Sequence, residues 1–120
     1  MEKAKLFIGL IISPGLDLGI VHKCIEEQFG QIETASKTFD FSHTSYYQHE
    51  MGLNLSKQFY TIKPLISVAS AYKEKVKAVS LEQQFLKNGN RLVNIDPGIL
   101  TAHNVILLTT KNYAHRIPLN

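Results

Sequence analysis

Cysteine is almost absent from this 120-residue chain: Cys24 stands alone, so an internal disulfide is excluded. Its place beside Ile25 in an amphipathic stretch indicates a small packing residue, because an unpaired cysteine behaves as a hydrophobic side chain. Long apolar runs are missing too. The longest, Leu6–Ile12, is far shorter than the ~20 residues that cross a bilayer, and no small-residue cleavage site follows it. We therefore expect a buried strand there, a cytoplasmic protein and no membrane partner.

Sequence motifs of fixed spacing are also lacking. No Walker A sequence, no G-x-G-x-x-G and no G-x-S-x-G occurs, which argues against P-loop nucleotide binding and α/β-hydrolase chemistry. The net charge of +3 is concentrated in residues 56–91, where six lysines and Arg91 stand against two glutamates. This segment favours an anionic partner. No RNP-like, zinc-finger or Gly-rich element accompanies it, so we expect a solvated helix face and no nucleic-acid partner. The sequence leaves the identity of any cofactor unknown.

The first third of the chain predicts a strand followed by a helix. Lys5–Ile12 is apolar and β-branched and ends at Ser13-Pro14-Gly15, where Ser13 is expected to cap the next helix. The apolar residues of that helix recur at spacings of three, four and four and share one face: Leu18, Val21, Ile25 and Phe29. Gly30 is the expected stop.

Two strands and a second helix are predicted next. Gln31–Phe41 and Leu55–Leu65 have β character and flank a polar connection, Ser42–Asn54. Ser67 is expected to cap a helix that runs to about Leu86. Its inward residues are expected to be Ala69, Tyr72, Val76 and Val79.

The last third predicts short strands. Arg91–Ile95 is expected to stop at a type II turn formed by Asp96-Pro97-Gly98, and Val105–Thr110 and His115–Leu119 are further extended pieces. The order β-α-β-β-α-β predicts an α+β fold, a ferredoxin-like two-layer sandwich with one or two extra C-terminal strands, in one domain spanning 1–120. A three-layer α/β sheet would need more helices than the pattern contains.

Polar residues gather in two stretches, Asp40–Gly52 and Asn94–Arg116. Imidazole and carboxylate are natural metal ligands and acid–base groups, and the metal candidates are His43, Glu50, Asp96 and His115. The spacing of His43 and His49 matches no standard metal motif. The alternative is a connection whose tyrosines pack on the sheet and whose Asp40 and Ser42 cap turns.

The second stretch offers a different chemistry. Lys111, His115 and Arg116 together suit a phosphate or carboxylate, because arginine supplies a bidentate fork and lysine a point charge. Asp96 and Asn94 lie where a strand is expected to end, a common place for functional groups. The alternatives are an ordinary turn at Asp96 and surface charge on a strand edge.

Four segments resemble a bacterial family known only as domain of unknown function 4416, and the resemblance covers essentially the whole chain. They are Lys5–Ile11, Phe39–Gly52, Val93–Thr101 and Thr109–Ile117. The resemblance implies the positions to watch: Tyr46, Tyr47, Glu50, Asn94, Asp96, Lys111, His115 and Arg116. Ser45 stands where the family usually has an acidic residue, which weakens a metal–carboxylate site. Members also usually continue past the His-Arg segment, so we expect a shortened member.

Three hypotheses follow. The first is a domain that binds a small anionic ligand at a site formed by residues 40–52 and 94–116, with Tyr46, Tyr47, Asn94, Lys111 and Arg116 as ligand-binding candidates. The second is a metal-assisted hydrolase or transferase with Glu50, Asp96 and His115 as catalytic candidates. The third is an interaction module that forms a homodimer through a sheet edge. A structure in which the two polar stretches meet would separate these hypotheses.

Overall fold

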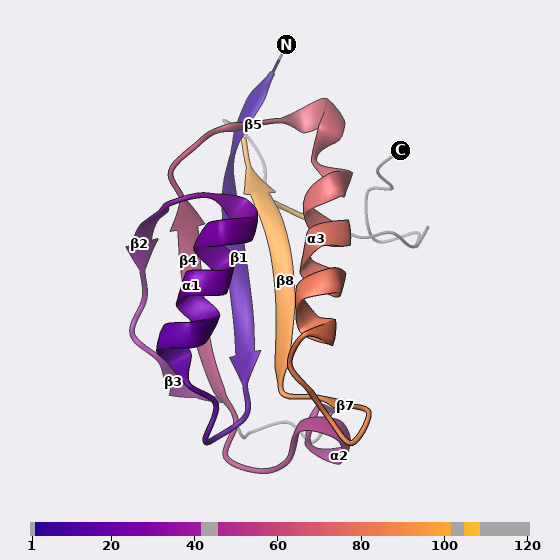
Figure 1. Cartoon of the computed structure of the whole chain (residues 1–120). Coiled ribbons are helices and arrows are strands. Elements are labelled where there is room, and N and C mark those ends of the chain that lie inside the picture. The colour runs from indigo at the N-terminus through magenta and orange to yellow at the C-terminus, as the bar shows by residue number, and fades with distance from the viewer. Residues whose placement is uncertain (1, 42–45, 102–104, 109–120) are drawn as a thin grey trace.

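A computed structural model describes residues 2–41, 46–101 and 105–108. Its centre is β1 (Lys3–Ile12), which pairs antiparallel with β4 (Ser56–Ile62) on one side and with β8 (Val93–Leu100) on the other (Figure 1). The sheet continues outward in the order β2-β4-β1-β8-β9, with β2 at Ile32–Ala35 and β9 at Val105–Leu107. Two short strands extend it: β3 (Phe39–Asp40) beside β4, and β5 (Ile66–Ser67) beside β1. The predicted α+β class, with a mainly antiparallel sheet, is confirmed.

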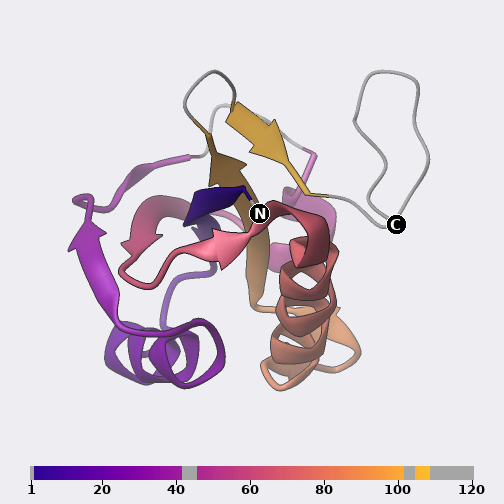
Figure 2. The same cartoon turned by 90° about the horizontal axis from the view of Figure 1, so that it is seen from above.

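Both long helices, α1 (Leu18–Phe29) and α3 (Tyr72–Gln83), cover the same face of the sheet (Figure 2). Alternate β1 residues point toward them and are almost fully buried, because side chains in a strand alternate between faces. The main core joins these residues to apolar positions of α1, α3, β4 and β8, among them Leu6, Ile8, Leu10, Val21, Ile25, Tyr60, Leu81, Ile95 and Ile99. Within the described ranges, no helix combines the length and apolarity needed to span a bilayer.

The buried positions Val21, Ile25 and Phe29 of helix α1 and its end before Gly30 were correctly predicted. Its start and its cap were not, because the helix begins at Leu18, which is 38% exposed. The side chain of Asp17, not that of Ser13, accepts hydrogen bonds from the backbone N–H groups of Gly19 and Ile20. Ser13 instead donates its hydroxyl proton to the Met51 carbonyl at 2.8 Å. This bond ties the end of β1 to a short helix, α2 (Gln48–Met51), inside a segment that was expected to be an irregular connection.

The inward face predicted for α3 was wrong. Val76 and Val79 are 55% and 42% exposed, whereas Glu74, Ala78, Leu81 and Glu82 are the buried residues of this helix. Glu82 turns inward instead, where its carboxylate accepts hydrogen bonds from the Ile95 N–H and from Arg91, and Glu74 pairs with Lys77 of the same helix. A 3-10 turn, η1 (Val68–Ser70), precedes the helix, and Ser67 makes no side-chain capping bond there.

The predicted turn at Asp96-Pro97-Gly98 was also wrong, because β8 runs straight through these residues. A proline is tolerated in this strand because of the direction its backbone faces. The Pro97 carbonyl accepts the Leu108 N–H on the β9 side. In an antiparallel strand the N–H and C=O of one residue point to the same neighbour. The missing N–H of Pro97 therefore removes no hydrogen bond to β1.

A hairpin connects α3 to β8 at the lower end of the molecule in Figure 1. It consists of β6 (Leu86–Lys87) and β7 (Asn90–Arg91), joined through the predicted turn at Asn88-Gly89, where both residues have positive φ. Helix α2 lies against β7, while Met51 and Leu55 bury Ile11 on the sheet face opposite α1 and α3. The hairpin and α2 thus bring residues 46–52 beside the start of β8.

Candidate functional site

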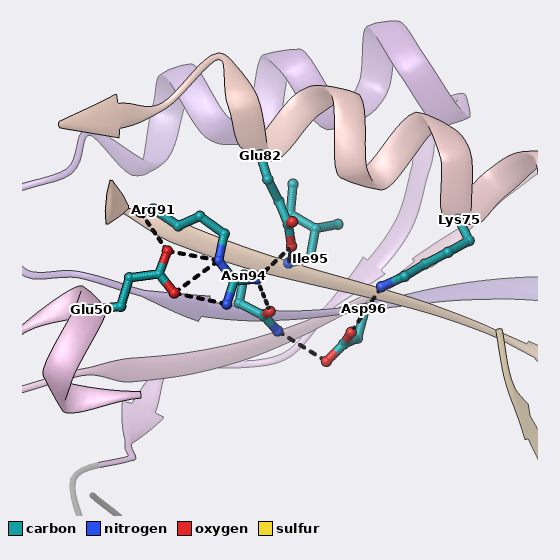
Figure 3. Close-up of polar contacts among 7 residues, drawn as sticks. All are labelled: Glu50, Lys75, Glu82, Arg91, Asn94, Ile95 and Asp96. Carbon is teal, nitrogen blue, oxygen red and sulfur yellow. Dashed lines mark hydrogen bonds and ion pairs between the residues drawn. The ribbon is translucent and has the colours of Figure 1, made fainter. Parts of the chain in front are cut away.

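Arg91, at the end of the hairpin, binds three polar side chains from different parts of the chain (Figure 3). Its Nε and Nη2 atoms each donate to the Glu50 carboxylate of α2 at 3.0 Å, and its backbone N–H donates to Glu50 Oε2 at 2.7 Å. Its Nη1 atom donates to Asn94 Oδ1 at 2.7 Å and to Glu82 Oε2 at 3.5 Å. Such forked arginine–carboxylate contacts fix geometry as well as charge.

The network continues from Asn94 to α3. The Asn94 Nδ2 atom donates to Asp96 Oδ2 at 2.9 Å, and Lys75 Nζ donates to Asp96 Oδ1 at 3.4 Å. Asn94 is buried, whereas the Asp96 side chain is 48% exposed. The two polar stretches of the sequence therefore do meet in their described parts: Glu50 reaches Asp96 through Arg91 and Asn94. We refer below to Glu50, Lys75, Glu82, Arg91, Asn94 and Asp96 as the polar network.

Glu82 and Asn94 are the buried members of the polar network, and Glu82 carries the charge. Its Oε2 atom accepts the Ile95 backbone N–H at 2.6 Å, on the side of β8 that faces away from β1. Burial raises the pKa of the Glu82 carboxyl, against the opposing influence of the Ile95 hydrogen bond and of Arg91. The Glu82 carboxylate thus accepts the Ile95 N–H of β8 in place of the backbone carbonyl of a neighbouring strand.

The pKa values of Glu50, Arg91 and Tyr47 are shifted for different reasons. The hydrogen bond from the Arg91 side chain lowers the pKa of Glu50, and the same bond raises the pKa of Arg91. Burial, followed by the charge of Asp96, raises the pKa of Tyr47. Three carboxylates in the polar network face two cations, so this group of residues is mildly acidic and its arginine is already occupied.

The stability contributed by Glu82 should fall as pH rises. Its pKa in the folded state is raised above the unfolded value, so the folded state binds the proton more tightly. The stabilisation is full below the unfolded pKa and is lost as pH rises through the folded pKa. Glu82→Gln should remove this trend, which has a slope of at most about 1.4 kcal/mol per pH unit. Urea denaturation from acid to neutral pH measures it, and an exposed α1 carboxylate variant, Glu27→Gln, should keep the wild-type slope.

Of the residues proposed from the sequence, the structure brings Tyr47, Glu50, Asn94 and Asp96 to one end of the sheet. Tyr46 contacts the Tyr47 ring edge-on, with ring centroids 4.8 Å apart, and is 78% exposed. His43, Lys111, His115 and Arg116 lie outside the described residues. No group of three potential metal ligands occurs within residues 2–41, 46–101 and 105–108. The metal assignment stays a prediction.

Sequence reasoning missed Lys75, Glu82 and Arg91, which hold the polar network together. Arg91 was placed at a strand start, and Glu82 was placed on a solvated helix face. A usable signal was present: Glu74, Ala78, Leu81 and Glu82 repeat at helical spacing. Two carboxylates on that face are a reason to look for basic partners, because buried charges are paired.

A cleft lies beside Glu50, at the end of the sheet where α2, the hairpin and the loop after β1 meet. Its volume is about 320 Å³, within the usual range for small-molecule sites. We call it the end cleft, and its lining residues are Ser13, Pro14, Glu50, Met51, Gly52, Leu53, Lys87, Asn88, Asn90 and Leu92. Lys87 is the one cation among these lining residues, and Glu50 is the one anion.

The fold and the site define a small α+β domain with a partly buried polar network and an adjoining cleft. The family described as Domain of unknown function (DUF4416) matches residues 2–120, and the chain belongs to that family. The match confirms the resemblance found in the sequence. No curated protein and no solved structure matches the chain.

Proposed function

We propose that this protein binds a small anionic ligand in the end cleft. The observation that carries the proposal is the arrangement of charge there. The charge of Glu50 is compensated by Arg91, whose Nη2 atom lies 3.0 Å from Glu50 Oε1. Lys87 also lines the cleft and is exposed. An incoming phosphate or carboxylate would therefore meet a lysine and the side-chain amides of Asn88 and Asn90, with the Glu50 charge already compensated.

The polar network supports the cleft by fixing its wall. Glu50 projects from α2, a helix of one turn that is too short to hold a side chain rigidly by itself. Four hydrogen bonds from Arg91 fix the Glu50 carboxylate, and the bond from Ser13 to Met51 fixes the other end of α2. A prearranged wall lowers the entropy cost of binding. Lys111 and Arg116, predicted from the sequence to bind the anion, lie outside the described residues and stay a prediction.

Lys87→Glu should abolish binding of an anion in the end cleft. Because the Lys87 side chain is exposed on the hairpin, reversing its charge should leave the fold unaffected. Isothermal titration with inorganic phosphate and with citrate measures the affinity, and a loss of at least about tenfold is expected, equivalent to ~1.4 kcal/mol. Lys23→Glu on the exposed side of α1 makes the same charge change and should leave binding unchanged. Equal loss in both variants would mean that only overall charge matters, and no heat with wild type would reject the proposal.

The core topology supports a ferredoxin-like classification. The strands equivalent to a split β-α-β unit are β1, β2, β4 and β8, adjacent in the order β2-β4-β1-β8, with α1 and α3 on one face. The additional β9 extends the edge beyond β8. Small ligands of α+β sandwiches can lie at the end of the sheet, where loops and short helices meet, and the end cleft has this position.

The metal-assisted enzyme and the homodimer remain alternatives to anion binding. For the enzyme, Glu50 and Asp96 already bind basic side chains, so a metal would have to displace Arg91 or Lys75. A thermal-shift series with Zn²⁺, Mn²⁺ and Mg²⁺ tests it, because a metal that binds the folded state raises the melting temperature. For the homodimer, light scattering of the purified chain gives the mass directly.

A further inference from the structure

The sheet face opposite α1 and α3 carries aromatic side chains on its central strands. Cross-strand partners share a face, so the register places on this face Lys5, Phe7 and Gly9 of β1, Lys57, Phe59 and Thr61 of β4, and Asp96, Gly98 and Leu100 of β8. We call this surface the open face. Helix α2 covers only its Ile11 end, and no other described helix lies over it (Figure 2).

Glycines let two rings of the open face lie against the backbone of the neighbouring strand. Phe7 is paired with Gly98, and a Cβ at Gly98 would collide with the Phe7 ring. Phe59 is paired with Gly9, and a Cβ at Gly9 would come within 3.2 Å of the Phe59 ring. Rings that lie over glycines in this way turn a π-face toward solvent, as a stacking platform requires.

The rings form a continuous exposed surface. Phe59 is 40% exposed and Phe39, on β3, is 46% exposed, and their rings stack with centroids 6.2 Å apart. Beside them is a shallow depression of about 490 Å³, lined by Phe7, Phe59 and Leu100 together with the hydroxyl-bearing residues Thr34, Ser36 and Thr61. Apolar rings interleaved with hydroxyls suit a ligand that offers flat bases and polar edges.

The charge of the open face is positive in the described part of the chain. Its two carboxylates are each paired with a lysine: Glu33 with Lys5 at 3.0 Å, and Asp96 with Lys75 at 3.4 Å. Lys57, in contrast, lies over an aromatic ring, with its Nζ atom 5.4 Å from the Phe59 centroid. Lys37 follows Ser36 at the rim and is exposed. Cations next to exposed rings complement an anionic, base-bearing polymer.

We propose that the open face binds single-stranded nucleic acid, with Phe7 and Phe59 each stacking on a base and Lys57 contacting a phosphate. Lys57 and Phe59 have the spacing of the first and third positions of the RNP1 signature of RNA-recognition sheets, although Gln58, Tyr60, Thr61 and Pro64 depart from it. The full motif is absent, which is why the sequence argued against this partner. Exposed rings, positive charge and a sheet face that no described helix covers beyond Ile11 support this partner independently of the end cleft.

Fluorescence anisotropy with a labelled oligouridine of about ten nucleotides tests the proposal, since sites on such folds span roughly 4–16 nucleotides. The wild-type chain should bind the single strand more tightly than a duplex of equal length. Phe59→Leu keeps apolar area but removes the π-face, so it should weaken binding roughly 5- to 150-fold, the fold-change expected for losing one stacked base. Phe7→Leu should do the same, and Phe59→Tyr should retain binding.

Further measurements separate nucleic acid from other occupants. Lys57→Gln should reduce the slope of log K against log salt by about 0.7, the value for one phosphate contact to a single strand. Val79→Ala, a change at an exposed apolar position of α3, should alter neither affinity nor slope. Wild-type failure to bind, equal affinity of Phe59→Leu and wild type, or equal binding of uridine monophosphate and the oligomer would overturn the proposal. A dimer in light scattering that Phe59→Leu dissociates would assign the face to a second copy instead.

Discussion

Arg91→Met should lower the free energy of unfolding by about 3 kcal/mol, the lower end of the range for breaking a buried charge pair. The substitution keeps an unbranched apolar stem, although a shorter one, and leaves Glu50 and the buried Glu82 without their guanidinium partner, and Asn94 without a donor. The lower end applies because 27% of the Arg91 side chain is exposed and water screens part of the interaction. Equilibrium denaturation with urea at neutral pH measures the change.

The partners of Arg91 provide the control. If the pair acts as a unit, the double variant Glu50→Gln/Arg91→Met should cost less than the sum of the single variants, by about 0.5–3 kcal/mol. Lys73→Met makes the same kind of change at an exposed α3 position and should stay within about 0.5 kcal/mol of wild type. Additive effects of the two network variants would show that Glu50 and Arg91 do not stabilise one another.

Tyr60→Ala and Phe59→Ala should differ widely although the residues are neighbours on β4. Tyr60 is 2% exposed and packs in the main core, with its ring edge-on to His22 of α1, so its loss should cost about 3–5 kcal/mol. Phe59 points to the open face and is 40% exposed, so its loss should cost no more than about 1 kcal/mol. Thermal and urea denaturation of both variants measure the contrast.

Tyr60→Phe isolates the hydroxyl group. The hydroxyl is hydrogen-bonded to Gln58 Oε1 at 3.0 Å, and burial raises its pKa. Removing this bond should cost about 1 kcal/mol, the usual net value of one hydrogen bond. If Phe59→Ala and Tyr60→Ala lowered the free energy of unfolding by similar amounts, the register of β4 with β1 would be wrong, because that register places the two side chains on opposite faces of the sheet.

The sequence predicted the fold well where one physical signal dominated. In α1 the apolar spacing of Val21, Ile25 and Phe29 agrees with the stop at Gly30. Strand β1 is apolar because α1 and α3 cover one of its faces and α2 covers part of the other. The inward face of α3 was wrongly predicted because its valines fit an apolar stripe, whereas Glu82 turns inward to the Ile95 N–H and to Arg91, two partners outside the helix. Propensity and periodicity within a helix carry no information on partners outside it.

The candidate site was predicted by location but not by chemistry. Glu50, Asn94 and Asp96 were singled out, and they do converge. The residue that joins them, Arg91, lies 41 positions from Glu50 and has no local motif. The Asp-Pro-Gly segment suggested a turn because its residue types are the usual ones for a turn. Pairing with β1 outweighs that preference, since Pro97 directs its missing donor away from β1 and Gly98 makes room for Phe7.

The central place of β1 has a consequence for synthesis on the ribosome. Leu6 must pair with Ile99, and Ile12 with Val93, so β1 is synthesised well before β8, its partner on one edge. At roughly 5–20 residues per second, the ~80 intervening residues take roughly 4–16 s to translate. During that interval β1 emerges with its sheet edge unsatisfied and depends on α1, or on a chaperone, for cover.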